Sequence, residues 1–264
     1  MGKRLKNACK VADYEKAVAK GRGQGRFDEY RPYFNIREVC SQAIRTRFYV
    51  RRFNHLYQLM SYGEVLALMI LDWDERNIEV REQYPLEPNI TLKLAKQYGI
   101  KHPGYTQGYT VMTTDFLVTR VVDGRQTLRA FQIKYDKAQA EEPRTREKLQ
   151  LEELYWKQRN VPWCVTYTTN FNQAFCRNLE LIAPFRNHRY EKGLLIRLKE
   201  PVLELTATRP YIPYTESHDI TLNVAGELWP LDEALRALLG AKLITCPIKE
   251  RELLTMTLAD FSEK

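Results

Sequence analysis

Residues 111–136, VMTTDFLVTRVVDGRQTLRAFQIKYD, decide the fold of this chain. The stretch predicts two strands rich in β-branched and aromatic residues. Asp123-Gly124 separates them, and this dipeptide between two such strands is the strongest short-range signal for a β-hairpin. If these two residues form the loop, Val122 lies opposite Arg125 and the pairing of all earlier residues follows from that pair.

Either plausible loop length brings three polar residues of this hairpin onto one sheet face. A two-residue loop places Asp115 opposite Gln132, and a four-residue loop places it opposite Lys134. Only a one-residue slip, such as a bulge, would separate the three. A carboxylate, a carboxamide and a lysine on one face suit metal-dependent phosphodiester cleavage. The structural alternative is a half-exposed polar face with an Asp–Lys pair.

The composition indicates a soluble, globular protein. No run approaches 18 consecutive apolar residues, and the basic N-terminal end lacks the apolar core of a signal peptide. We therefore expect a cytoplasmic protein without membrane association. The five cysteines are scattered and form no C-x-x-C motif. This pattern indicates reduced thiols rather than disulfides or a structural zinc site.

The positive charge is concentrated at the N-terminal end. Residues 1–60 contain 14 Lys and Arg against 5 Asp and Glu, whereas the remainder contains 27 against 28. Arginines alternate with aromatic residues over 45–53, which suits phosphate contact together with stacking or packing. Nucleic-acid binding and an ordinary solvated basic face are the two interpretations.

The segments around the hairpin predict a mixed sheet with helices on its faces. Before the hairpin we expect a basic helix over 3–20, a glycine-rich loop over 21–25, short strands within 31–54, a helix over 61–73, a strand over 78–86 and a short helix over 92–99. The glycine-rich loop lacks the flanking strand and the Lys-Ser/Thr of a P-loop, so a close backbone approach or a flexible loop explains it better.

A helix over 143–159 and a strand over 162–169 follow the hairpin. They complete a βαβ unit, so the third strand should run parallel to the second. Within the helix, Lys148 and Glu152 have the spacing of an ion pair across one turn.

Glu64 has two interpretations. Ser61 and Glu64 fit the S-x-x-E capping box, in which the glutamate bonds back to the cap amide. Alternatively, the carboxylate in this first helical turn binds the same metal as Asp115. The two interpretations compete for one side chain.

The character of the chain changes near residue 170, so we expect a catalytic domain over 1–169 and a second domain over 170–264. A helix over 231–240 and strands over 243–248 and 253–258 are similar to the end of a winged helix-turn-helix. The charge of this part is balanced, which favours contact with a protein at least as much as contact with DNA.

One or two Mg²⁺ ions suit the predicted chemistry, with Mn²⁺ as an alternative ion. Mg²⁺ keeps several waters, so one or two carboxylates and substrate phosphate suffice as further ligands. Asp115 would supply the central carboxylate and Glu64 the second, with the Gln132 amide oxygen and the Ile133 carbonyl as further ligands. Lys134 would orient the attacking water or stabilise the developing charge.

The series Glu64, Asp115, Gln132-Ile133-Lys134 resembles the core of PD-(D/E)xK nucleases. Further segments, in the same order, are similar to the TnsA family of transposon endonucleases: GRGQG (21–25), REQYPL (81–86), GIKHP (99–103), MTTDFLV (112–118), QIK (132–134), EKLQLE-x-x-YW (147–156) and VPW (161–163). The resemblance covers roughly residues 20–165. It implies an α/β, restriction-endonuclease-like catalytic core followed by a smaller, winged-helix-like C-terminal domain.

The resemblance also assigns roles to residues. It makes Glu64, Asp115, Gln132 and Lys134 catalytic, and it places Mg²⁺ on Glu64, Asp115, Gln132 and Ile133. Glu152 matches an acidic position on the following helix. Gln132 departs from the general nuclease pattern, which has Glu or Asp there. The TnsA family shares this departure, which leaves the metal site with one charge fewer.

The function implied by the resemblance is cleavage of the 5′ ends of a transposon in the bacterial cytoplasm. Double-stranded transposon-end DNA, a DDE-type transposase (TnsB) and an AAA+ regulator (TnsC), bound through the C-terminal region, are the implied partners. One alternative is a non-catalytic nuclease-fold subunit that bridges DNA and these partners. A standalone restriction-type nuclease is another, although no separate sequence-reading element is evident.

Overall fold

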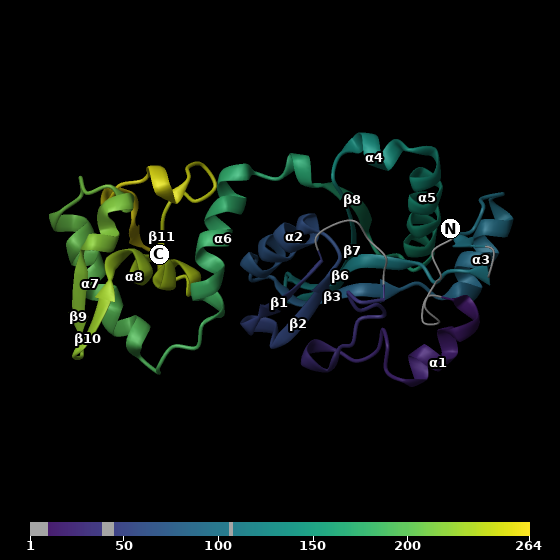
Figure 1. The fold of residues 1–264 in the computed structure, drawn as a ribbon, viewed down its shortest axis with the longest axis horizontal. Coiled ribbons are helices and arrows are strands. Elements are labelled where there is room, and N and C mark those ends of the chain that lie inside the picture. Colours follow the sequence, from purple (N-terminus) through teal and green to yellow (C-terminus); the bar gives the residue numbers. More distant parts are fainter. Residues whose placement is uncertain (1–9, 39–44, 106–107) are drawn as a thin grey trace. The chain divides into compact units, whose positions relative to one another are not determined.

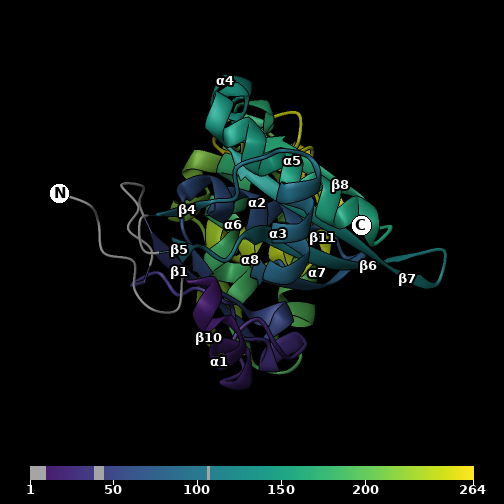
Figure 2. The same cartoon turned by 90° about the vertical axis from the view of Figure 1, so that its right-hand side faces the viewer.

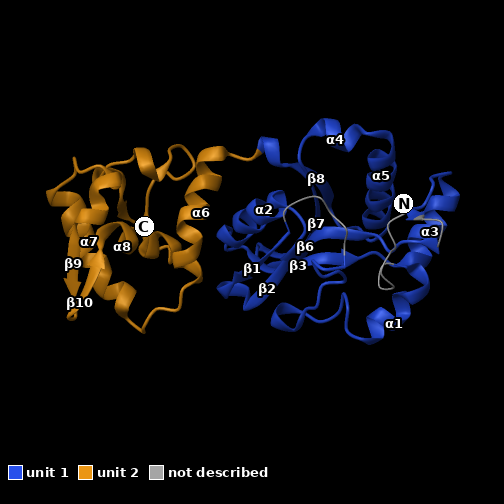
Figure 3. Cartoon of the chain, viewed as in Figure 1, with its two compact units in different colours: residues 1–170 blue, residues 171–264 orange. Residues whose placement is uncertain are grey.

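The computed structural model describes residues 10–38, 45–105 and 108–264. The chain divides into two compact units, residues 1–170 and 171–264 (Figure 3). This division falls one residue beyond the boundary expected from the sequence. Each unit is described by itself.

A four-stranded mixed sheet forms the centre of the first unit (Figure 1). Its strand order is β3 (Asn77–Pro85), β6 (Thr113–Val122), β7 (Arg125–Lys134) and β8 (Trp163–Tyr167). The first three strands pair antiparallel, and β8 runs parallel to β7. The predicted mixed sheet and its parallel third strand are therefore confirmed.

Helices and short hairpins surround this sheet. The helices are α1 (Tyr14–Ala19), α2 (Tyr62–Trp73), α3 (Pro88–Gln97), α4 (Lys137–Glu141) and α5 (Pro143–Gln158). The hairpins pair β1 (Thr46–Val50) with β2 (His55–Leu59), and β4 (Gly104–Tyr105) with β5 (Gly108–Tyr109). Single 3₁₀ turns lie at Val11–Asp13, Phe27–Glu29, Arg51–Phe53 and Thr168–Asn170.

The β6–β7 hairpin has the predicted two-residue loop. Val122 lies opposite Arg125, and the same register continues to Phe116 opposite Phe131. Asp123 and Gly124 have φ angles of 49° and 73°. Two positive φ angles define a type I′ turn, whose twist matches that of the strands. The turn end extends away from the rest of the first unit (Figure 2).

One buried cluster fixes α3 and α5 against the sheet. It joins Leu117 of β6 and Ala130 of β7 to residues of the two helices: Leu94, Ala95, Leu151, Tyr155 and Trp156. The Trp156 indole donates a hydrogen bond of 2.7 Å to Thr114 Oγ1, so the polar atom of this ring is also satisfied. Burial of each large side chain contributes about 1.5–3 kcal/mol, and this packing sets the position of α5 beside the sheet.

The N-terminal part packs on the sheet through a close backbone approach. Gly23, with φ of 68°, lies against Pro85 so closely that a Cβ atom would be 2.3 Å from the proline Cγ. This confirms the close-approach interpretation of the glycine-rich loop. The helix expected over 3–20 is shorter than predicted: α1 begins at Tyr14, and residues 3–9 lie outside the described residues.

Part of the basic segment serves packing. Arg52 pairs with Asp72 at 3.0 Å, and its guanidinium lies 4.4 Å from the centroid of the buried Phe53 ring. Of the short strands expected within 31–54, the structure has β1, and its partner β2 follows directly after that range. Residues 31–38 form no strand, and residues 39–44 lie outside the described residues.

The second unit contains three α-helices, one short hairpin and one further pair of two-residue strands. Its elements are α6 (Gln173–Asn187), α7 (Leu194–Thr208), a 3₁₀ helix (Tyr214–Asp219), β9 (Thr221–Val224), β10 (Glu227–Pro230), α8 (Leu231–Gly240), β11 (Ile244–Thr245), 3₁₀ turns at Leu253–Thr255 and Leu258–Asp260, and β12 (Ser262–Glu263). β9 pairs with β10, and β11 pairs with β12.

The strands predicted over 243–248 and 253–258 are therefore wrong in extent and pairing. β11 spans two residues and pairs with β12, while the second predicted strand contains a 3₁₀ turn. A buried side chain explains the difference: the Asn178 amide donates to the carbonyls of Ile248 and Arg251 and accepts from the Leu253 amide. These bonds fold the segment against α6 instead of leaving it to form a ribbon.

No described helix combines the length and apolar character that a membrane span requires. Cys164, Cys176 and Cys246 are free thiols, as expected, whereas Cys9 and Cys40 lie outside the described residues.

Candidate active site

The antiparallel ladder between β6 and β7 stops one pair before Asp115 and Gln132. Its last pair is Phe116 with Phe131. Beyond it, the Asp115 side chain occupies the position of the missing ladder: its Oδ2 accepts a 2.8 Å hydrogen bond from the Ile133 amide. The Asp115 amide donates to Gln132 Oε1 at 3.3 Å. The predicted proximity of Asp115 and Gln132 therefore arises through side chains rather than through a ladder pair.

The carboxyl end of β7 is held by β8 instead. Gln132 pairs with Val165 and Lys134 pairs with Tyr167 in the parallel ladder. The Lys134 ammonium donates to the Ile133 carbonyl at 3.0 Å. Strand β8 thus fixes the backbone of Gln132, Ile133 and Lys134 on one side. Asp115 of β6 approaches the same residues from the other side.

Glu64 enters the same site from the first turn of α2. Ser61 Oγ caps the helix by accepting from the Glu64 amide at 3.2 Å, while Glu64 Oε2 accepts from the Met60 amide at 2.9 Å. The capping interpretation therefore holds in a variant form, because the carboxylate bonds the residue before the cap. The same carboxyl group also lies close enough to Asp115 for their charges to interact. The capping bonds of Glu64 therefore form while its carboxyl group lies beside Asp115.

The two carboxyl groups are buried and destabilise each other's charged form. Burial first, and then the charge of Asp115, raises the pKa of Glu64 to about 8. Burial also raises the pKa of Asp115, against the opposing effects of Lys134 and the Ile133 amide. Two buried acids that repel each other suit a bound cation, because a cation removes the repulsion and replaces lost solvation.

Gln83 is a further residue of this site, and the sequence analysis missed it. Its side-chain nitrogen lies 3.4 Å from Glu64 Oε2, and its Oε1 accepts from Thr113 Oγ1 at 3.2 Å. It also lies near enough to Asp115 to oppose the rise that burial causes in that residue's pKa. The strand over 78–86 also contains Glu79, Arg81 and Glu82, so one more polar residue there gave no distinct signal in the sequence.

An unusual backbone conformation at Gln83 accompanies the contacts of its side chain with Glu64 and Thr113. Its φ of 48° is uncommon for a residue other than glycine and unusual within a strand. The pairing of β3 with β6 includes the residues on both sides but skips Gln83 and Asp115. As a result Glu82 bonds His55 of β2, whereas Tyr84 packs on Trp156 of α5. Strained backbone of this kind concentrates at functional sites.

Glu152 of α5 is a buried acid beside this group. Its Oε1 accepts from Thr114 Oγ1 at 2.6 Å and from the Trp163 indole at 2.9 Å. Burial raises its pKa to about 8, and the charge of Asp115 adds to that shift. Within the described residues, no group of three or more His, Cys, Asp or Glu side chains could hold a metal ion. Glu152 therefore does not complete a three-acid site with Glu64 and Asp115.

The remaining donor set still fits a hard cation. Two carboxylates, an amide oxygen and a backbone carbonyl are oxygen ligands of the kind that Mg²⁺ accepts, with water and phosphate filling the other positions. These donors belong to Glu64, Asp115, Gln132 and Ile133.

A pocket of about 300 Å³ opens beside these residues, between α5 and the ends of β6 and β7. We call it the α5 pocket. Gln132 and Lys134 line one wall, Thr110–Thr113 line another, and α5 contributes Thr145, Lys148, Leu149 and Glu152. The spacing of the helical residues puts them on one face of α5.

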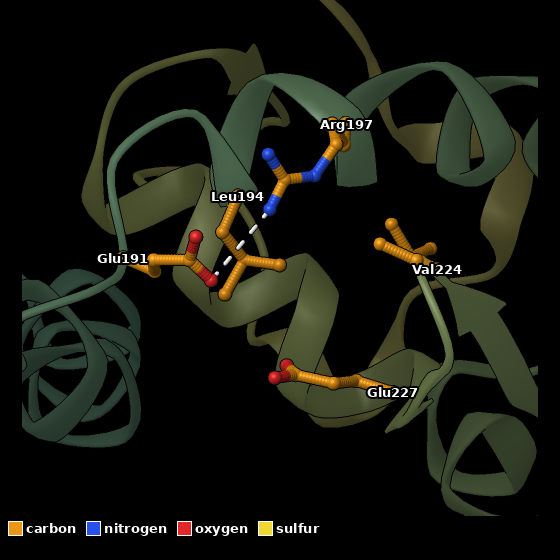
Figure 4. A pocket seen from close by; sticks show the side chains of 6 residues that line it. Glu191, Leu194, Arg197, Val224 and Glu227 are labelled. Atoms are coloured by element: carbon orange, nitrogen blue, oxygen red, sulfur yellow. Dashed lines mark ion pairs between the residues drawn. The ribbon is translucent and has the colours of Figure 1, made fainter.

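A second hollow, of about 350 Å³, lies in the C-terminal unit between the start of α7 and the β9–β10 hairpin (Figure 4). Arg197 reaches Glu191 at 3.8 Å across it, and Glu227 lies on its other side (Figure 4). This surface contains one exposed ion pair and no group of catalytic side chains.

Two comparisons with known proteins agree with this geometry. Residues 74–168 match the family model described as TnsA-like endonuclease N terminal. Over 181 residues the chain is 34% identical to the transposon Tn7 transposition protein TnsA of Escherichia coli, a match that covers 69% of this chain and 66% of that protein. The matched family segment contains Asp115, Gln132, Lys134 and Glu152 and begins after Glu64. By these matches the chain belongs to the family of TnsA-type endonucleases.

Proposed function

We propose that this protein is the DNA endonuclease subunit of a cut-and-paste transposase and that it cleaves the 5′ ends of the transposon with Mg²⁺. The arrangement of Asp115 is the observation that supports this proposal most. Its buried carboxylate interrupts the β6–β7 ladder, bonds the Ile133 amide and lies close to Glu64 and Lys134. This interruption does not stabilise the sheet, because it removes ladder hydrogen bonds. It does place a carboxylate where a hydrolytic site needs one.

Each residue has a role in this proposal. Glu64 and Asp115 would hold the ion, together with the Gln132 amide oxygen and the Ile133 carbonyl. When bound, Mg²⁺ supplies activation of water and neutralisation of charge on the phosphate and the leaving oxygen. Lys134 would place its ammonium beside the scissile phosphate, where it stabilises developing negative charge. Its bond to the Ile133 carbonyl keeps the ammonium at the end of β7.

The partners belong to the proposal as well. They are double-stranded transposon-end DNA, the DDE-type transposase TnsB and the AAA+ regulator TnsC. We assign contact with TnsC to the C-terminal unit, residues 171–264, as a winged-helix-like domain. The three helices α6, α7 and α8 support this description, and the hairpin β9–β10, which precedes α8, takes the place of the ribbon expected after that helix. Mn²⁺ would substitute for Mg²⁺ because it accepts the same oxygen ligands.

Strand-resolved cleavage of transposon-end DNA tests the proposal. The protein, its partner transposase and Mg²⁺ are combined, and wild type is compared with Asp115→Ala. Wild type should add 5′ nicks, and the variant should lose those nicks while 3′ cleavage and joining persist. Equal 5′ cutting by the two proteins would refute the assignment of the site.

A non-catalytic bridging subunit is the second candidate. The capping bonds of Glu64 and the amide at position 132 favour it, since both leave fewer free charges for a metal. A bridging subunit needs no metal, so transposition should then survive both Asp115→Asn and Lys134→Ala. Loss of function in these two variants, with partner binding intact, excludes it. Site-specific cutting by the isolated protein would instead support a standalone nuclease.

A further inference from the structure

Lys148 of α5 is a cation of the α5 pocket that the proposed chemistry leaves unused. It lies one helical turn after Thr145 and one turn before Glu152, and all three line the pocket opposite Gln132 and Lys134. Lys148 is exposed to solvent, so a ligand can reach it.

The ion pair expected between Lys148 and Glu152 does not form. Glu152 is directed instead to Thr114 and Trp163. The charged groups that act on Lys148 are both cations, Arg144 and Lys134, and they add to partial burial in lowering the pKa of its ammonium. No carboxylate in the described part of the chain pairs with this lysine.

Among the described residues Lys148 has no carboxylate partner, and the two cations that act on it are Arg144 and Lys134. An anion bound beside Lys148 would relieve this repulsion. Two neighbouring groups make the pocket suitable for a phosphate. The Thr145 hydroxyl lies on the same helical face and donates only a long bond of 3.5 Å to Glu142 Oε2, so it can turn to a phosphate. The Lys134 ammonium already lies at the end of β7. A lysine ammonium binds phosphate as a point charge and needs no bidentate geometry.

We propose that Lys148, with Thr145, forms a binding subsite for a backbone phosphate of DNA next to the scissile phosphate. This inference rests on the proposed function, because it takes the duplex at the active site as the source of the phosphate. The subsite positions the DNA strand against Lys134 and takes no part in bond cleavage. It reads no sequence, since phosphate contacts carry none.

The salt dependence of DNA binding tests the subsite. A plot of log K against log salt concentration has a negative slope. Each protein–phosphate contact that is removed makes this slope shallower by about 0.9. Fluorescein-labelled double-stranded DNA is titrated with the full chain in EDTA, so that no cleavage occurs. Wild type is compared with Lys148→Ala and Lys148→Arg. Lys157→Ala is the matched control, because Lys157 is an exposed lysine at the other end of the same helix.

We expect Lys148→Ala to bind DNA several-fold more weakly and to lose about one unit of slope. Lys148→Arg should retain the slope, and Lys157→Ala should match wild type. Equal slopes for Lys148→Ala and wild type would overturn the proposal. So would a loss of slope in Lys157→Ala of the same size, or failure of wild type to bind DNA at the lowest salt.

A cleavage assay on the same proteins separates this inference from the proposed function. If binding depends on Lys148 but wild type never cuts, the phosphate subsite stands and the nuclease proposal fails. If wild type cuts and Lys148→Ala cuts with unchanged KM and salt slope, the nuclease proposal stands and the subsite is refuted.

Discussion

Gln83 Nε2 lies 3.4 Å from Glu64 Oε2, which ties the irregular position of β3 to the first turn of α2. The same glutamine side chain lies near enough to Asp115 to oppose the rise in that residue's pKa. Its backbone, with φ of 48°, leaves the β3–β6 ladder at this point. One strained residue thus contacts both acids proposed to bind the metal.

Replacing Gln83 with leucine should impair metal use more than it impairs folding. Leucine retains most of the volume but removes the amide that orients Glu64 and Asp115. Partners of metal ligands typically change affinity or activity about 10–100-fold when removed. We therefore expect 5′ cleavage to fall by about that factor and the half-maximal Mg²⁺ concentration to rise. A Mg²⁺ titration of cleavage measures both quantities.

Gln126→Leu is the control for this variant, because Gln126 is exposed near the turn of the β6–β7 hairpin. Its Mg²⁺ dependence should equal that of wild type. A Gln83→Leu protein with unchanged Mg²⁺ dependence would show that Gln83 has only a structural role.

Replacing Lys134 with methionine should stop chemistry while leaving the protein folded. Methionine keeps an unbranched side chain of similar length but removes the ammonium beside the Ile133 carbonyl. Loss of one group that stabilises transition-state charge typically costs about 10²–10³ in rate. Single-turnover cleavage of transposon-end DNA should show a loss of this size. Lys137→Met, at an exposed lysine paired with Glu141, should cut at the wild-type rate.

Glu152 should make the protein less stable as the pH rises. Its pKa is about 8 in the folded protein, against an ordinary value of 4.5, because it is buried. Between these two values the folded state holds a proton that the unfolded state has lost. The contribution of Glu152 to stability is therefore fully present below about pH 4.5 and is lost as the pH rises through about 8.

Urea unfolding across this pH window measures the effect. In Glu152→Gln the free energy of unfolding should decline less steeply with pH than in wild type. Some decline should remain, because the pKa of Glu64 is raised in the same direction. Glu153→Gln changes an exposed neighbour and should reproduce the wild-type curve. Parallel curves for wild type and Glu152→Gln would show that Glu152 titrates near its ordinary pKa.

Local turn chemistry made the centre of the fold predictable. Asp123-Gly124 sets the loop, and the loop alone determines every pair from Val122–Arg125 to Phe116–Phe131. The end of the β6–β7 ladder at the pair Phe116–Phe131 was not predictable. At this point Gln83 of β3, a distant segment of the chain, lies beside Asp115 and Glu64. Nothing in the sequence REQYPL requires a positive φ at a glutamine.

The C-terminal errors have a comparable cause. Ile244–Thr245 pairs with Ser262–Glu263 over two residues only, which is too short for alternation to show in the sequence. The apolar residues over 253–258 look like a strand, but their hydrogen bonds are determined by Asn178, about 75 residues earlier. Tertiary contacts of this kind are not visible in local propensity.

A comparison of two glycines should separate backbone strain from steric contact in the first unit. Gly23 and Gly124 have similar φ angles, 68° and 73°, but only Gly23 has a neighbour where a Cβ atom would lie, Pro85 Cγ at 2.3 Å. Gly124→Ala should lower the free energy of unfolding by about 1–2 kcal/mol, the cost of a left-handed backbone for alanine. Gly23→Ala should cost that amount and about 1–3 kcal/mol more, because the proline ring and the N-terminal segment must move apart. Thermal and urea unfolding of the two variants measure the difference, and equal losses would show that the N-terminal segment shifts away from β3 without cost.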